Sequence, residues 1–154
     1  MTQFTSDTPS SPVTQRQHWM SVLARAEVTD LERYCDGLSH MPAYRYLRPS
    51  ETGLAMVQGR TGGTGSPFNL GEVTLSRCVV ELDSGSRGFG YVRGRNRHHA
   101  ELAALLDALL QDAPEEHGPA LIEPLYRQWL QARETTARKA AATRVDFMTM
   151  VRGS

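Results

Sequence analysis

The fold is decided by the stretch GYVRGRNRHHAELAALLDALL, residues 90–110, where a strand-like segment leads into a regular helical pattern. Five leucines recur at helical spacing and predict a helix with an apolar face, namely Leu102, Leu105, Leu106, Leu109 and Leu110. Asn96 stands just before this helix and suits its N-cap, because an asparagine side chain accepts a hydrogen bond from a free N–H group there. The segment 114–119, with a proline at each end, is expected to break the helix.

Upstream of this helix the sequence changes character. Glycine, proline and β-branched residues are frequent between residues 44 and 95, which is typical of an antiparallel sheet with turns. Three segments are strand candidates, residues 53–60, 72–82 and 86–95. The last two are expected to form a hairpin through a turn at Asp83, Ser84 and Gly85.

Helical patterns precede and follow the predicted sheet. Trp19, Val22, Leu23 and Ala26 recur at helical spacing and predict a helix over residues 13–27. Thr29 and Glu32 have the spacing of a capping box, which predicts a second helix ending near Gly37. A final helix is predicted from Ile122, Leu125, Tyr126 and Trp129, with Pro124 in its first turn, and it extends through the alanine-rich residues 135–144.

The order of these elements predicts the fold class. N-terminal helices, a central antiparallel sheet and C-terminal helices make an α+β architecture rather than alternating βαβ units. Residues 12–154 are expected to form a single domain, because 154 residues suit roughly one. Residues 1–11 are rich in Ser, Thr and Pro and are expected to be a disordered lead.

Composition excludes several classes of protein. Seventeen Lys and Arg residues balance seventeen Asp and Glu residues, so no net field attracts nucleic acid or an anionic membrane. The chain contains no apolar stretch of the roughly 18 residues that a membrane span needs. Cys35 and Cys78 have neither a disulfide framework nor the spacing of zinc ligands, so no metal site is predicted and a cytoplasmic location fits.

A glycine-rich run, GRTGGTGSPFNLG at residues 59–71, separates the first two strand candidates. Its N–H groups are suited to form a nest around a phosphate. The candidate contacts are Arg60, Gly62, Gly63, Thr64 and Gly65. The alternative is a tight turn between strands, and the run matches neither a Walker loop nor a dinucleotide fingerprint.

Basic residues gather where the last strand candidate meets the leucine helix. The predicted contacts with an anionic substrate are Arg93, Arg95 and His99, because arginine forks and a helix N-terminus both favour anions. The alternative is a solvated arginine cluster with a packing histidine. His98 and His99 would point about 100° apart on a helix, which disfavours a shared metal ion.

Catalytic machinery is not apparent in the sequence. Ser84 and Ser86 lie in DSGSRG, which lacks the GxSxG pattern of a nucleophile elbow. Cys78 is expected to be a small buried hydrophobe. Glu101 and Asp107 are expected on the solvated face of the leucine helix.

The C-terminal segment is unusually apolar for a chain end. Five side chains in residues 144–151 are predicted to bind a partner, namely Val145, Phe147, Met148, Met150 and Val151. Their spacing allows docking either as a helix turn or as an extended strand. The alternative is that the segment folds back onto its own domain.

Five blocks in this order resemble the PhnG family, a subunit of the bacterial carbon-phosphorus lyase system. They span residues 16–26 (RQHWMSVLARA), 51–60 (ETGLAMVQGR), 62–78 (GGTGSPFNLGEVTLSRC), 90–110 and 144–153 (RVDFMTMVRG). The resemblance covers nearly the whole chain. Asn96 departs from the aspartate expected in much of the family, which keeps a helix cap and removes one charge.

The resemblance implies a role in organophosphonate catabolism. A PhnG-type subunit acts with PhnH, PhnI and PhnL to make α-D-ribose 1-phosphonate 5-triphosphate from MgATP and an alkylphosphonate, releasing adenine, and PhnJ later cleaves the carbon-phosphorus bond. The chain would be part of a hetero-oligomeric transferase, bind no cofactor alone and not be catalytic alone. Two roles remain open: a structural partner of the other subunits, or a contributor to a phosphate or phosphonate site.

Overall fold

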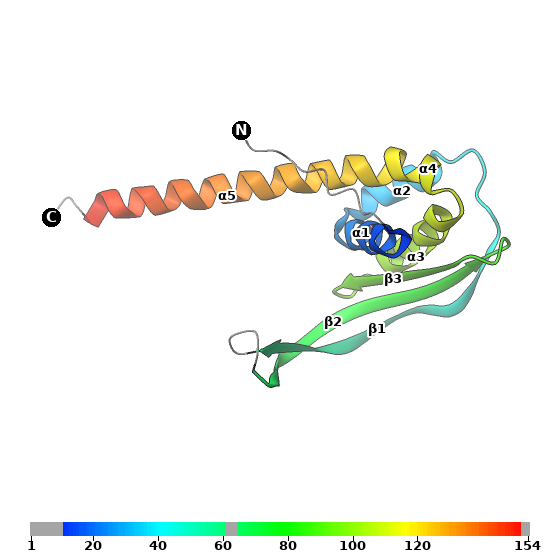
Figure 1. Ribbon diagram of the computed structural model, residues 1–154, viewed down its shortest axis with the longest axis horizontal. Coiled ribbons are helices and arrows are strands. Elements are labelled where there is room, and N and C mark those ends of the chain that lie inside the picture. The colour runs from blue at the N-terminus through cyan, green and yellow to red at the C-terminus, as the bar shows by residue number, and fades with distance from the viewer. Residues whose placement is uncertain (1–10, 61–64, 152–154) are drawn as a thin grey trace.

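The computed structural model describes residues 11–60 and 65–151, and it confirms the α+β class, with helices before and after an antiparallel sheet (Figure 1). The elements are α1 (Pro12–Arg25), α2 (Val28–Asp36), β1 (Tyr44–Arg60), β2 (Pro67–Leu82), β3 (Arg87–Arg93), α3 (Arg97–Asp112), α4 (Pro114–His117), the π-helical turn η2 (Gly118–Ile122) and α5 (Glu123–Val151).

The described strands form an antiparallel sheet in the order β1-β2-β3. The predicted hairpin of β2 and β3 is confirmed, with pairing from Glu81↔Arg87 to Leu75↔Arg93. β1 begins at Tyr44, earlier than the predicted start at residue 53, because it pairs with β2 as far as Leu82. Beyond the end of β3, β1 and β2 continue as a curved two-stranded ribbon (Figure 1), which we call the arm, residues 53–60 and 67–74.

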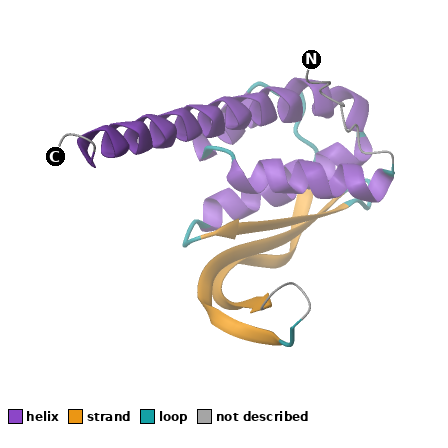
Figure 2. Ribbon diagram, turned by 60° about the vertical axis from the view of Figure 1, so that its left-hand side comes forward, coloured by secondary structure: helices purple, strands orange, loops and turns teal. Residues whose placement is uncertain are grey.

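The helices lie on one side of the sheet (Figure 2), and α3 is the central layer between the sheet and α1. Alternate residues of β2 are buried beneath α3, namely Ser76, Cys78, Val80 and Leu82. All five leucines of the predicted helix are buried, because α3 is covered from more than one side. The leucine pattern thus forms the core that positions both ends of β3.

Glycines in β3 allow α3 to lie directly on the strand. A Cβ atom at Gly88 would stand 1.8 Å from the carbonyl oxygen of Ala104, and one at Gly90 would stand 2.0 Å from that of Ala100. Backbone atoms of a helix cannot yield as a flexible side chain does. The alternation GFG in the sequence therefore marks a close approach of strand and helix.

The ends of the helices confirm some predictions and correct others. Asn96 caps α3, accepting a hydrogen bond of 3.0 Å from the His99 N–H, and Pro124 lies in the first turn of α5. The predicted capping box is wrong: α2 has Glu27 at its N-cap with no side-chain cap, so Thr29 lies inside the helix. α3 ends before the prolines as predicted, but residues 114–122 remain helical.

Asp107 is not on a solvated face, which corrects the sequence prediction. Its side chain is fully buried, and it accepts hydrogen bonds from Arg16 (2.9 Å), the indole N–H of Trp19 (2.7 Å) and the backbone N–H of Phe89 (2.9 Å). The neighbouring Gln111 side chain donates 2.6 Å to the carbonyl of Arg87. These contacts join α1, α3 and the outer edge of β3, and they satisfy a carboxylate that would otherwise be costly to bury.

Both thiols are expected to react slowly in the folded chain. Burial, and secondarily the charge of Glu101, raises the pKa of Cys78 to about 11, and burial raises that of Cys35 to about 11. A higher pKa leaves less thiolate, so at pH 8 iodoacetamide should label native Cys78 at least about 100-fold more slowly than a free thiol. Mass spectrometry of native and urea-unfolded chain measures this. Equal labelling of Cys78 in both states would contradict its buried position.

Candidate functional site

The junction of β3 and α3 is held by the neighbouring strand. After Arg93 the chain turns at Gly94, whose positive φ of 92° favours glycine. The Gly94 N–H donates 2.8 Å to the Thr74 carbonyl, and the Ser76 hydroxyl donates 2.7 Å to the Gly94 carbonyl. This turn fixes where Arg95 leaves the sheet and where α3 begins.

Arg95 and Arg97 line a recess of about 540 Å³ where the arm leaves the body of the protein. We call this hollow the arginine recess. Its lining consists of Thr52, Gly53, Leu54, Thr74, Arg95 and Arg97. Two guanidinium groups, two hydroxyls and one apolar side chain therefore share one open hollow, which suits an anion with a small organic part.

These two arginines differ from Arg45 and Arg87 on the outer face of the sheet. Arg45 and Arg87 both pair with Glu81, at 2.6 and 3.0 Å, and their hydrogen bonds lower the pKa of that carboxyl. Within residues 11–60 and 65–151, neither Arg95 nor Arg97 forms an ion pair. The recess therefore presents positive charge to solvent.

The structure separates the other predicted anion contacts from the recess. Arg93 is exposed and alternates with the buried Val92, so it lies on the outer face of the sheet, paired with Leu75. His99 is buried, and its Nε2 lies 2.8 Å from the Leu23 carbonyl, as in the packing alternative. Its ring faces α1 and not the recess.

The glycine-rich run lies at the far end of the arm. Arg60 is six residues beyond Leu54 along β1, roughly 20 Å away at about 3.3 Å per residue. Gly65 lies just before β2, and Gly62, Gly63 and Thr64 lie outside the described residues. The structure therefore does not bring Arg60 or Gly65 to the recess, and it adds Thr52 and Thr74, which the sequence prediction lacked.

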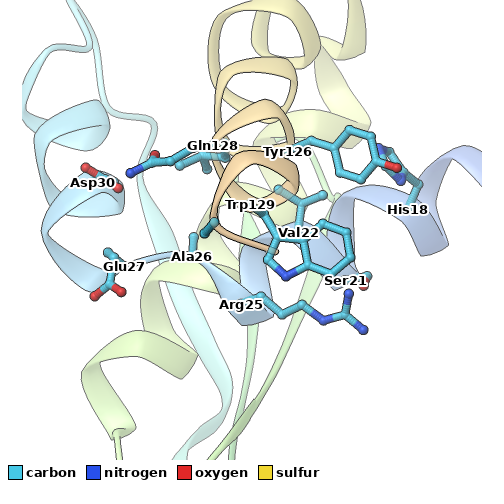
Figure 3. A pocket seen from close by; sticks show the side chains of 12 residues that line it. His18, Ser21, Val22, Arg25, Ala26, Glu27, Asp30, Tyr126, Gln128 and Trp129 are labelled. Atoms are coloured by element: carbon cyan, nitrogen blue, oxygen red, sulfur yellow. The ribbon is translucent and has the colours of Figure 1, made fainter. Parts of the chain in front are cut away.

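A second hollow, a groove of about 370 Å³, runs between α1 and α5 (Figure 3). Trp129 lies against it, with the guanidinium groups of Arg25 and Arg133 at 4.9 and 5.3 Å from the ring centre. Tyr126 stacks on Trp129 and meets the edge of His18. In this aromatic cluster, His18, Arg25, Tyr126, Trp129 and Arg133, Trp129 is only half-buried, whereas Trp19 is buried in the core.

Apolar side chains are exposed on both projecting elements. On the arm, Leu54, Met56 and Leu70 are more than half exposed, at 68, 58 and 63 %. Residues 130–143 of α5 are exposed on every side of the helix, which leaves the body (Figure 1). The backbone of residues 144–151 continues this helix, which favours the helical over the extended form of the C-terminal segment. The side chains of Val145, Phe147, Met148, Met150 and Val151 lie outside the described part.

Over residues 11–60 and 65–143, no group of three or more His, Cys, Asp or Glu side chains is arranged to hold a metal ion. Within those same ranges, no helix has both the length and the apolar character to cross a bilayer.

Two comparisons bear on the family of the chain. A family model described as "Phosphonate metabolism protein PhnG" matches residues 14–153. A protein of Rhizobium meliloti (strain 1021) is 45 % identical over 145 residues, covering 92 % of this chain and 91 % of that protein. That relative is the alpha-D-ribose 1-methylphosphonate 5-triphosphate synthase subunit PhnG.

Proposed function

We propose, since the chain belongs to the PhnG family of phosphonate metabolism proteins, that it is a subunit of an α-D-ribose 1-methylphosphonate 5-triphosphate synthase. The match extends over nearly the full length of both chains. The further partners we propose are PhnH-, PhnI-, PhnJ- and PhnL-type subunits in the cytoplasm. MgATP and an alkylphosphonate are then substrates of the assembly.

The role we propose for this chain is to hold other subunits together. The observation that carries it is the free length of α5, residues 130–151, roughly 33 Å long at about 1.5 Å per residue. Most helical stability in proteins comes from the tertiary packing of one helix face. Residues 130–143 have exposed side chains throughout, so a covering partner would supply the packing that this part of α5 lacks.

The groove beside α1 extends this surface onto the body of the protein. Trp129 and its flanking Arg25 and Arg133 belong to the residue types that dominate binding energy at protein interfaces. The groove and the free length of α5 share one helix, so a single partner can cover both. This continuity supports one docking surface rather than two separate surfaces.

Truncation after Thr143 tests the structural role. The shortened chain should keep its thermal midpoint within about 2 °C, because the removed residues follow a stretch, 134–143, whose side chains are all exposed. It should lose at least tenfold in co-purification with the four other subunits, because the apolar end of α5 is removed. Affinity capture from cells that co-express all five subunits measures the loss, and differential scanning calorimetry of the isolated chain measures the midpoint.

A chain ending at Val151 is the matched control, and it should co-purify like the full chain. Full recovery of the complex with the chain truncated after Thr143 would place the docking surface elsewhere. A fall in the thermal midpoint of the shortened chain would show instead that the segment belongs to its own core. Growth of a deletion strain on methylphosphonate, restored by the full chain only, links assembly to function.

A further inference from the structure

The arginine recess gathers positive charge. Arg95 and Arg97 both line it, and neither pairs with a carboxylate within the described residues. On the outer face of the sheet Arg45, Arg77 and Arg87 all contact glutamates at 2.6 to 3.0 Å, whereas Arg93 at the end of β3 contacts none in the described part of the chain. Unpaired guanidinium groups that share a hollow repel one another, and an anion between them removes that repulsion.

The start of α3 adds a second unfavourable arrangement of charge. The first turn of this 16-residue helix contains no acidic residue and carries Arg97 and His98, although the positive end of a helix favours negative charge. His98 is compensated by Glu32 of α2 at 2.7 Å. Arg97 has no such partner among the described residues, so an external anion would stabilise this end of the helix.

The walls of the recess indicate which anion fits. Thr74 contributes a hydroxyl beside the two guanidinium forks, and together these donors match the several acceptor oxygens of a tetrahedral oxyanion. The Ser76 hydroxyl donates its proton to the Gly94 carbonyl, so the Thr52 hydroxyl, 3.2 Å away, donates to Ser76 and forms a fixed wall of the recess. Leu54 supplies an apolar wall, and about 540 Å³ exceeds the needs of one such ion.

We propose that the arginine recess binds the phosphoryl or phosphonyl group of an organic ligand, with Arg95 and Arg97 as the charged contacts. The identity of that ligand rests on the proposed function, but the oxyanion chemistry does not. Free phosphonate and the phosphate chain of a nucleotide share this chemistry. The recess would then contribute to substrate binding from a subunit that also holds the assembly together.

Titration of the ¹⁵N-labelled full chain tests the proposal. Inorganic phosphate, methylphosphonate and ATP are added separately at constant ionic strength, and the amide shifts of Gly53, Thr74 and Arg95 are followed. Saturable shifts at these residues are expected. Arg95→Gln and Arg97→Gln should each weaken binding about tenfold or more, because charge-assisted hydrogen bonds are lost.

Arg93→Gln is the matched control, since it removes one positive charge nearby but from the opposite face of the sheet. The Arg93→Gln chain should bind the probes as tightly as the unaltered chain does. Arg95→Lys keeps the positive charge, so it should bind more tightly than Arg95→Gln. Tightest binding of methylphosphonate identifies a phosphonate site, and tightest binding of ATP a nucleotide site. The absence of saturable shifts with all three probes, or an equal loss in Arg93→Gln, would overturn the proposal while leaving the assembly test unaffected.

Discussion

Alanine at position 90 is expected to lower the free energy of unfolding by about 3 kcal/mol, near the upper end for an overpacked core. The added Cβ would stand 2.0 Å from the carbonyl oxygen of Ala100 and 2.8 Å from the backbone nitrogen of Ala104. Only a shift of α3 away from β3 relieves that overlap. Such a shift opens the core along the whole length of the helix, because its leucines pack on the same sheet.

Urea denaturation of the purified chain measures this loss. Gly88→Ala is expected to lower the free energy of unfolding by a similar amount. Gly53→Ala serves as the control, because nothing lies within 4 Å of its added Cβ. Its stability should stay within about 0.5 kcal/mol of the unaltered chain. If Gly90→Ala were as stable as Gly53→Ala, α3 could not lie as close to β3 as described.

Replacing Asp107 by alanine is expected to cost about 2 to 6 kcal/mol, because two N–H groups lose their acceptor at about 1 to 3 kcal/mol each. The indole N–H of Trp19 and the backbone N–H of Phe89 would both lose their acceptor inside the protein. Arg16 would lose its carboxylate partner, although its side chain is 34 % exposed and can turn to water. Asp107→Asn keeps one acceptor oxygen, so its free energy of unfolding should fall between those of the unaltered chain and Asp107→Ala.

The matched control for this change is Asp112→Ala at the end of the same helix. Asp112 is exposed and accepts hydrogen bonds from Ser84 and Ser86, so its loss should cost only about 1 kcal/mol. Urea denaturation compares the two variants, and near-UV circular dichroism reports the environment of Trp19. Equal losses in both variants would mean that burial adds nothing to the contacts of Asp107.

Periodicity predicted the framework of this protein because the leucines of α3 and the alternation in β2 repeat over many residues. It missed the burial of Asp107 because α3 is enclosed by the sheet on one side and by α1 on another. The alanines at 103, 104 and 108 are the signal of that enclosure, since small residues between leucines admit close neighbours. Thr29 was misplaced because its spacing to Glu32 fits a capping box, whereas α2 begins at Val28.

The sequence predicts where the candidate site lies but not which residues form it. The sequence places the basic residues together, and strand alternation alone would put Arg93 and Arg95 on the same face of the sheet. The positive φ of Gly94 redirects the chain between them. Thr52 and Thr74 depend on the pairing register of β1 with β2, which contains irregularities at several points. Such a register is set by tertiary contacts and not by a local pattern.

The outer edge of β3 matters before the subunit binds its partners. Its Arg87 carbonyl and Phe89 N–H already bond to Gln111 and Asp107, so α3 occupies hydrogen-bonding groups that a neighbouring chain would otherwise use. Open strand edges are templates for aggregation. Before a newly synthesised subunit meets its partners, α5 and the arm are exposed, and this covered part of the β3 edge offers no template for a neighbouring chain. Loss of Asp107 would therefore expose the waiting subunit to aggregation as well as weaken its core.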